Sequence, residues 1–212
     1  MKPAILFDFD GTLFFGTAAL NTWCFTRALQ KMGLSEATGE KIAMSVGMTF
    51  QNVARLMTDS EEPEILAQFE ELTFLHVPSY IETHVRPDPV VHGMLAALGK
   101  QARLAVCSNA AASYLNPMLE ALGLTPFFDT IWAYHNNYRK ATAIPEVLRL
   151  LGSERGVFVG DRLEDVLAAR EAGIPVVGIR NAAYPAETDG ADITVENHVQ
   201  MQAAIETLLI RR

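Results

Sequence analysis

The chain has few cysteines, no long apolar run and no excess of positive charge. Cys24 and Cys107 are its two cysteines, and neither lies in a CxxC pair, so we expect two reduced, buried thiols in a cytoplasmic protein. No stretch reaches 18 apolar residues, and acids interrupt the first apolar run, MKPAILFDFD. The sequence therefore predicts neither a transmembrane helix nor a signal peptide.

The charge balance limits the partners that the chain can have. Seventeen Lys and Arg stand against 25 Asp and Glu, a net charge of -8. This balance argues against nucleic acid or a membrane surface as a partner. Half of the residues are hydrophobic, which is enough for a folded globular core.

Short apolar runs alternate with helical patterns along most of the chain. The helical patterns end at Gly123, Gly152 and Gly173, which are suitable C-terminal stops. The apolar runs do not alternate strictly, which is typical of strands buried on both faces. They are residues 4–9, 103–108, 130–134, 156–161 and 175–179. The pattern predicts an α/β fold, a Rossmann-like parallel sheet with helices on both faces, followed by a polar loop, a short strand at 191–195 and a final helix.

Residues 15–85 interrupt this alternation with helical patterns alone. The patterns cover residues 18–32, 36–46, 50–57 and 64–77. Gly16 marks the entry, and Pro87 and Pro89 mark the exit. We therefore predict an all-helical cap at 15–85, inserted into a core made of 1–14 and 86–212. Such a cap would lie over the carboxyl ends of the strands, where α/β sheets bind ligands.

Two carboxylates follow the first predicted strand in the stretch FDFDGTL. Asp8 and Asp10 are two residues apart, so on a strand they project to the same side. Gly11 and Thr12 then allow a sharp turn. Two carboxylates this close repel each other unless a cation or a shared proton lies between them. Oxygen ligands of this kind suit a hard divalent ion, and Mg²⁺ is the expected one.

Four stretches together resemble the signatures of the haloacid dehalogenase-like superfamily, in the order that the family has them. They are FDFDGTL, AVCSNA with Ser108 and Asn109, Lys140 in RKATAIPEVL, and VFVGDRLEDVLAAREAGIP with Asp161 and Asp165. The helical insertion resembles the cap of the phosphoglycolate-phosphatase-like branch. The resemblance runs from Ile5 to about Ile179.

This resemblance implies a mechanism for the acids. Asp8 would attack phosphorus and form an aspartyl-phosphate. Asp10 would protonate the leaving alcohol and then deprotonate water, for which its pKa must rise from about 4. We expect burial and the neighbouring Asp8 carboxylate to raise it. Mg²⁺ would be held by the Asp8 side chain, the Asp10 backbone carbonyl and Asp161.

The resemblance also assigns residues to the phosphoryl group. Ser108 and Lys140 would surround the transferring oxygens as catalytic residues, and Asp165 would pair with Lys140 or orient the site. Three residues, Gly11, Thr12 and Asn109, are expected to contribute to substrate binding. Arg162 is expected either to bind a substrate anion or to pair with Glu164 or Asp165 at the surface.

The activity that the resemblance implies is Mg²⁺-dependent hydrolysis of a small phosphorylated metabolite, similar to phosphoglycolate phosphatase. A β-phosphoglucomutase-like phosphohexomutase is an alternative, but such mutases typically carry Glu-Asp where this chain has Gly160 and Asp161. A binding or regulatory module without catalysis is a second alternative. Phe14 and Phe15 make the predicted site entrance more apolar than in many relatives.

The stretch SVGMTFQNVARL is the part of the cap that we expect to select the substrate. Gly47 would break a helix there, and Thr49, Gln51 and Arg55 would face the site. We expect a small-molecule phosphate ester as the substrate and a monomer or homodimer as the assembly.

Overall fold

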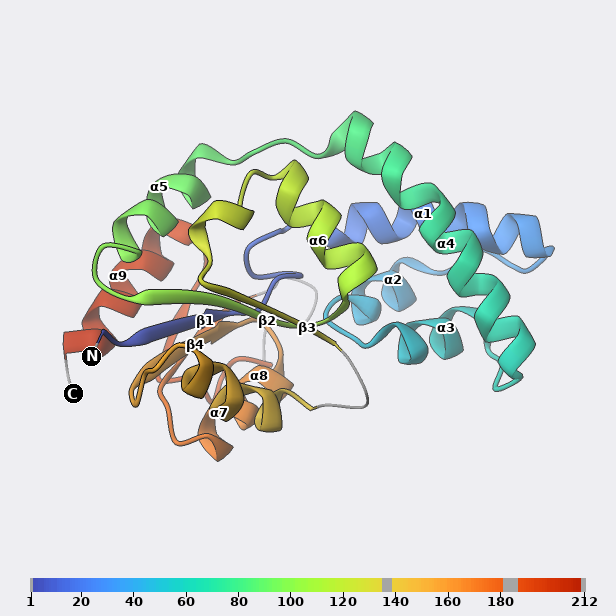
Figure 1. The fold of residues 1–212 in the computed structure, drawn as a ribbon. Coiled ribbons are helices and arrows are strands. Elements are labelled where there is room, and N and C mark those ends of the chain that lie inside the picture. Colours follow the sequence, from blue (N-terminus) through green and yellow to red (C-terminus); the bar gives the residue numbers. More distant parts are fainter. Residues whose placement is uncertain (1, 135–138, 181–186, 211–212) are drawn as a thin grey trace.

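The protein has an α/β fold built on one parallel sheet (Figure 1). The computed structural model describes residues 2–134, 139–180 and 187–210. Within them, six strands pair in the order β3-β2-β1-β4-β5-β6, and every pairing is parallel. The strands are β1 (Ala4–Phe7), β2 (Arg103–Ala111), β3 (Thr130–Tyr134), β4 (Gly156–Gly160), β5 (Val176–Ile179) and β6 (Ile193–Val195). The predicted fold class is confirmed.

Helices cover both faces of the sheet because alternate strand residues point to opposite sides. Ile5 and Phe7 of β1 pack with α5 (Pro89–Leu98), α6 (Ala112–Ala121) and α9 (His198–Ile210). Ala4 and Leu6 pack on the other face with α7 (Lys140–Leu150) and α8 (Leu163–Glu171). Figure 1 shows the first set of helices above the sheet and the second set below it. The apolar runs of the sequence are continuous because both faces are buried.

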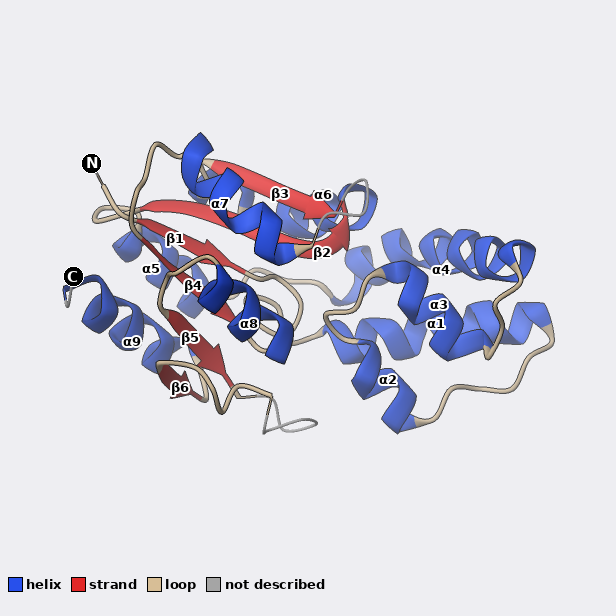
Figure 2. Ribbon diagram, turned by 90° about the horizontal axis from the view of Figure 1, so that it is seen from below, coloured by secondary structure: helices blue, strands red, loops and turns tan. Residues whose placement is uncertain are grey.

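Four helices occupy the chain between β1 and α5. They are α1 (Thr17–Met32), α2 (Gly39–Ser45), α3 (Phe50–Thr58) and α4 (Pro63–His84). Aromatic rings join them: the Phe25 and Phe69 centroids are 5.4 Å apart, and those of Phe50 and Phe74 are 4.8 Å apart. Figure 2 shows the four helices grouped beyond the carboxyl ends of the strands. This is the place expected for the predicted cap.

Several element bounds differ from the sequence-based expectation, including β1, which ends at Phe7 and not at Phe9, and three of them have a clear physical reason. Helix α4 continues through Pro78 to His84, because the burial of residues such as Tyr80 holds the turns beyond the proline in place. Helix α2 begins only at Gly39, because the Thr38 side chain accepts a hydrogen bond from Lys41 N and caps it there. Strand β2 extends to Ala111, with a shift of register after Cys107 that the apolar pattern does not show.

Other expectations hold. Helices α6, α7 and α8 end two residues before Gly123, Gly152 and Gly173, as predicted. Both cysteines are buried thiols without a disulfide. The predicted strand at 191–195 corresponds to β6, which is shorter and begins at Ile193. The polar loop before it lies partly outside the described residues.

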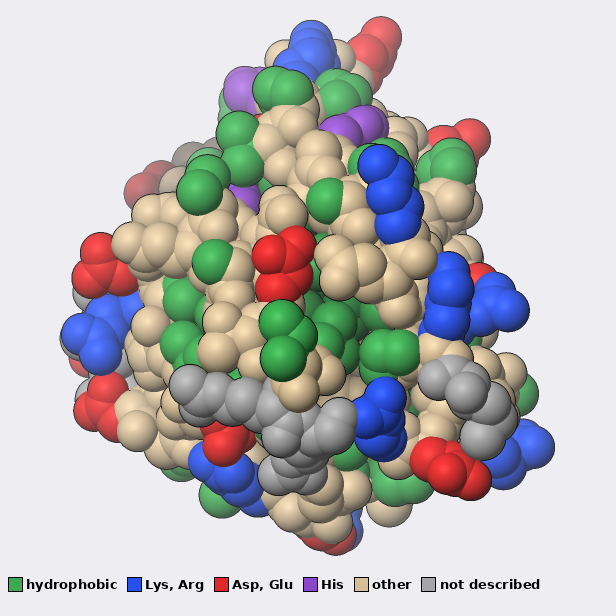
Figure 3. Space-filling model, turned by 90° about the vertical axis from the view of Figure 1, so that its left-hand side faces the viewer, with side chains coloured by type: hydrophobic (Ala, Val, Ile, Leu, Met, Phe, Trp, Pro, Cys, Tyr) green, Lys and Arg blue, Asp and Glu red, His purple; other side chains and the backbone are tan. Residues whose placement is uncertain are grey.

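The surface carries charged side chains of both signs. On the end of the molecule that faces away from helices α1–α4, acidic and basic side chains are interspersed (Figure 3). In the part of the chain that the structure describes, no helix is long and apolar enough to cross a membrane.

Candidate active site

A buried ion triad lies where β1, α7 and α8 meet. Asp8 follows the last residue of β1, Lys140 begins α7, and Asp165 lies in the first turn of α8. Lys140 Nζ is 2.9 Å from Asp8 Oδ1 and 2.6 Å from Asp165 Oδ1. The three side chains are at most 3% exposed. A positive charge at a helix N-terminus is unfavourable by itself, and the two carboxylates offset it here.

Burial and charge shift the pKa values of this triad in opposite senses. Burial raises the pKa of Asp8 to about 7, although the Lys140 ammonium opposes the rise. Burial alone would lower the pKa of Lys140, but the carboxylates of Asp165 and Asp8 raise it well above its usual value. Lys140 therefore stays charged.

The residues beside the triad fit a divalent cation. One carboxylate oxygen from each of Asp8, Asp161 and Asp165 lies within 4.8 Å of the others. Asp8 Oδ2 is buried and accepts no hydrogen bond from the described residues. No contact among them therefore offsets the free-energy cost of removing this oxygen from water. Asp165 already binds Lys140 and the backbone N–H of Arg162. Asp8 and Asp161 are therefore the carboxylates best placed to hold Mg²⁺, a hard ion that prefers oxygen.

Gly11 makes room for this acid cluster. Its φ is 80°, and a Cβ on it would lie 2.1 Å from Asp161 Oδ2. Any larger residue would displace the Asp161 carboxylate and would also strain the backbone. The role of this glycine is thus to let the backbone pass close to Asp161, next to the candidate metal site.

Asp10 lies apart from the triad and is held by two hydroxyl groups. Thr17 Oγ1 and Tyr114 Oη each donate a hydrogen bond of 2.8 Å to Asp10 Oδ1. Burial raises the pKa of Asp10, and these two hydrogen bonds moderate the rise. The direction agrees with our expectation. The raising cause at Asp10 is burial, and the repulsion between the two carboxylates raises the pKa of Asp8 in addition to burial. No sequence motif points to either hydroxyl group, and Tyr114 is 104 residues away from Asp10.

Ser108 and Thr12 lie buried near the strand ends. Ser108 Oγ accepts a hydrogen bond from Ala110 N, a local turn that belongs to the irregular end of β2. Thr12 Oγ1 is buried without a hydrogen-bond partner among the described residues, so it remains available to a ligand. The Thr12 carbonyl lies 2.8 Å from His198 Nε2, which ties the turn after β1 to helix α9.

Asn109 connects the core to the inserted helices. Its side-chain amide donates to the Gly47 carbonyl and to Glu164 Oε2, at 3.2 and 3.0 Å. These two bonds use the amide hydrogens of Asn109, so in this structure those hydrogens do not point toward a phosphate. Gly47 itself has a φ of 77° and lies between α2 and α3, the helix break that the sequence predicts.

The Arg162 side chain pairs with neither Glu164 nor Asp165, which corrects one of the two expectations. Its Nε is 2.7 Å from Glu187 Oε2, and its guanidinium also donates to the carbonyl of Val46. Asp165 is unavailable to this side chain because it is bonded to Lys140. Arg162 thus joins the core to the inserted helices, and the expected contact with a substrate anion remains a prediction.

The cap stretch also differs in part from expectation. Thr49 and Gln51 line an open groove that includes Asn109 and Arg162. Arg55 does not face the site, because its Nε is 2.7 Å from the exposed carboxylate of Glu61. If the Arg55 side chain turned toward the site, it would lose this ion pair and part of its hydration, which costs free energy.

The two phenylalanines after the first motif separate. Phe14 stacks on Phe9 at 5.9 Å and packs against the core. Phe15 is 52% exposed and stacks on the His198 ring at 4.4 Å. Of the two rings, Phe15 is the one that is exposed, and an apolar site entrance remains a prediction.

Comparison with known proteins agrees with this geometry. The family model of haloacid dehalogenase-like hydrolases matches residues 5–179, which include every acid of the site and Lys140. The chain belongs to the haloacid dehalogenase-like hydrolases. The family resemblance of the four signatures is therefore confirmed, and the protein is an enzyme of the hydrolase class.

Several relatives of this haloacid dehalogenase-like hydrolase are phosphoglycolate phosphatases. The protein from Agrobacterium fabrum is 30% identical over 194 residues, 84% of this chain and 81% of its own length. That from Rhodospirillum rubrum is 31% identical over 198 residues, 84% of this chain and 79% of its own. A crystal structure of a predicted phosphoglycolate phosphatase from Haemophilus somnus 129pt has a TM-score of 0.85 at 20% identity and covers 96% of this chain and 97% of its own. The last comparison shows a shared fold.

Proposed function

We propose that this hydrolase is a Mg²⁺-dependent phosphomonoesterase that acts through an aspartyl-phosphate. The observation that carries the proposal is Asp8: its carboxylate is buried beside Lys140 and keeps one oxygen without a hydrogen-bond partner among the described residues. A poorly solvated carboxylate next to a cation is suited to attack phosphorus. The phosphoglycolate phosphatases among the relatives support a phosphate ester as the substrate.

The first step transfers the phosphoryl group to Asp8. An Asp8 oxygen forms a bond to phosphorus while the bond between phosphorus and the leaving oxygen breaks. Asp10 donates its proton to that leaving oxygen, and the alcohol departs. Burial favours this protonated form of Asp10 because it raises its pKa. Lys140 offsets the negative charge of the phosphoryl oxygens, and Ser108 is proposed to donate a hydrogen bond to one of them.

The second step releases phosphate. Water gives a proton to Asp10, the water oxygen forms a bond to phosphorus, and the bond between phosphorus and the Asp8 oxygen breaks. Asp10 thereby regains the proton that it lost, and Asp8 is again a carboxylate. The Asp8 side chain, Asp161 and the Asp10 carbonyl are proposed to hold Mg²⁺, which would supply positive charge to the phosphoryl oxygens.

One contact favours a phosphatase over a mutase. A Cβ on Gly160 would lie 2.3 Å from Asp165 Oδ2. The glutamate that mutases with similar caps carry at this point has no space here unless Asp165 moves away from Lys140. We therefore place the phosphohexomutase second.

The test is phosphate release from a panel of phosphate esters that includes phosphoglycolate, with Mg²⁺ and with EDTA. We expect turnover that requires Mg²⁺ and is lost in Asp8→Asn. Asp59→Asn is a matched control, because Asp59 pairs with Lys41 at the surface and is 78% exposed. Activity in EDTA, or in Asp8→Asn, would contradict the mechanism. Tight Mg²⁺ binding without turnover of any ester would favour the non-catalytic alternative.

A further inference from the structure

A cavity lies beside Asp10, between the core and the inserted helices, and its lining bears on the identity of the leaving group. Its volume is about 60 Å³, so it accommodates a short leaving group and not a large one. Residues of α1, α3 and α4 line it together with Asp10, Ala110 and Tyr114 of the core. Because Asp10 is proposed to protonate the leaving oxygen, the rest of the leaving group would extend into this cavity.

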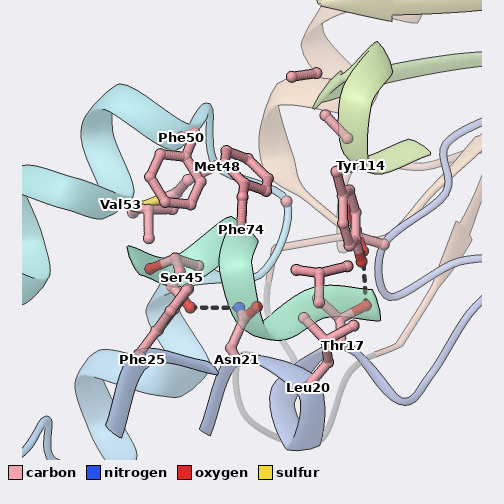
Figure 4. A pocket seen from close by; sticks show the side chains of 16 residues that line it. Thr17, Leu20, Asn21, Phe25, Ser45, Met48, Phe50, Val53, Phe74 and Tyr114 are labelled. Atoms are coloured by element: carbon pink, nitrogen blue, oxygen red, sulfur yellow. Dashed lines mark hydrogen bonds between the residues drawn. The ribbon is translucent and has the colours of Figure 1, made fainter. Parts of the chain in front are cut away.

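The walls of the cavity are mostly apolar. Figure 4 shows the rings of Phe50 and Phe74 close together on one side and Tyr114 on the other. The apolar side chains of the helical part are Leu20, Phe25, Phe50, Val53, Phe74 and Val77. Such walls favour an apolar ligand, since its transfer out of water lowers the free energy.

Asp10 is the charged residue among those that line the cavity, and no Lys, Arg or His of the described residues joins it there. A carboxylate placed in this space would be desolvated without a cation and would lie near the Asp10 carboxyl group. The nearby Arg162 is engaged by Glu187 and by carbonyl groups of the inserted helices. The cavity is therefore unfavourable for an anionic leaving group.

The cavity offers few hydrogen bonds to a polyhydroxylated leaving group. Thr17 and Tyr114 already donate to Asp10. Asn21 Nδ2 donates to Ser45 Oγ at 2.8 Å, a bond drawn in Figure 4. Thr73 Oγ1 is buried at the cavity wall with no partner among the described residues. A ligand with one hydroxyl or carbonyl group would satisfy Thr73, whereas a sugar would leave several groups unpaired.

The geometry points to a phosphate monoester of a neutral, mainly apolar alcohol as the substrate class, with one polar group that reaches Thr73. This inference rests on the proposed phosphatase function. The inferred substrate class differs from that of the phosphoglycolate phosphatase relatives, because the glycolate leaving group carries a carboxylate. The cap stretch expected to select the substrate contributes Met48, Phe50 and Val53 to these walls.

The test compares kcat/KM for n-butyl phosphate, phosphoglycolate and glucose 6-phosphate in the Mg²⁺-loaded wild-type enzyme. All three are esters of primary alcohols, so differences report on the leaving-group site more than on bond reactivity. We expect kcat/KM for butyl phosphate to be at least ~10²-fold higher than for either of the others. Each of the other two leaving groups would bury polar groups without partners in the cavity, which costs binding free energy in the transition state. Equal or better turnover of phosphoglycolate or of glucose 6-phosphate overturns the inference and leaves the proposed function intact. Turnover of no phosphate ester overturns both.

Two variants test the cavity itself. Val53→Phe fills it and should lower the ratio of kcat/KM for butyl phosphate to that for methyl phosphate by ~10-fold, whereas Leu75→Phe, at an exposed position of α4, should leave the ratio unchanged. Met48→Arg puts a cation at a half-buried position and should raise the phosphoglycolate to butyl phosphate ratio by ~10-fold. Unchanged ratios in both folded variants overturn the inference, and a variant that fails to fold leaves the wild-type comparison to decide.

Discussion

Replacement of Lys140 by Met should destabilise the protein even though the residue belongs to the proposed catalytic machinery. The side chain keeps a similar length but loses the charge that lies 2.9 Å from Asp8 and 2.6 Å from Asp165. Both carboxylates are almost fully buried, so water cannot replace the Lys140 ammonium group as the partner of either one. Removal of one member of a buried ion pair costs ~3–5 kcal/mol. At ~2–4 °C for each kcal/mol in a chain of this size, Tm should fall by roughly 6–20 °C.

The pH dependence of this loss follows from the pKa of Asp8. Burial raises that pKa to about 7 while Lys140 opposes the rise, so Lys140→Met must raise it further. A carboxyl group with a raised folded-state pKa favours folding below its unfolded pKa, and that contribution is lost as the pH rises through the folded-state pKa. The Tm difference between wild type and Lys140→Met should therefore be larger at pH 8 than at pH 5.

The assay is thermal unfolding followed by circular dichroism in EDTA, which removes any metal contribution. Arg149→Met is the matched control, because Arg149 pairs with Glu146 at the surface of the same helix and should leave Tm unchanged. Asp8→Asn should also abolish activity but retain the Lys140–Asp165 pair, so it should lower Tm far less. A Tm of Lys140→Met within 2 °C of wild type, or an equal deficit at both pH values, would refute the reasoning.

The remaining predictions concern the metal site, the proton donor and a thiol. Gly11→Ala should abolish Mg²⁺ binding in a calorimetric titration, because the new methyl group would displace Asp161; wild-type affinity would contradict this. Tyr114→Phe removes a hydrogen bond that lowers the pKa of Asp10, so the alkaline limb of the pH profile of kcat/KM should move to higher pH, and an unmoved limb would exclude this role. Burial raises the pKa of Cys107 to about 12, and the other cysteine is also buried; neither should react with a disulfide reagent at pH 8 until denaturant is added.

Much of the fold could be predicted from local patterns. Runs buried on both faces predicted the sheet strands, and glycine stops predicted three helix ends, because burial and backbone conformation are local properties. Helix α4 was predicted too short, because contacts from distant residues such as Trp23, whose ring centroid is 6.0 Å from that of Tyr80, support the helix beyond Pro78. A proline signal in the sequence does not show whether tertiary packing will override it.

For the candidate site, too, some features could be predicted from the sequence and others depend on tertiary packing. The resemblance of four sequence stretches to the family signatures predicted one site that contains Asp8, Lys140 and Asp161. The structure places Lys140 beside Asp8, and Asp161 within 4.8 Å of Asp8. The tertiary structure alone decided that Tyr114 would bind Asp10 from 104 residues away. It also decided that Arg162 would pair with Glu187, and that the cavity beside Asp10 would have no cation among its described lining residues. These pairings depend on how separate elements pack, and no local pattern of residues records that packing.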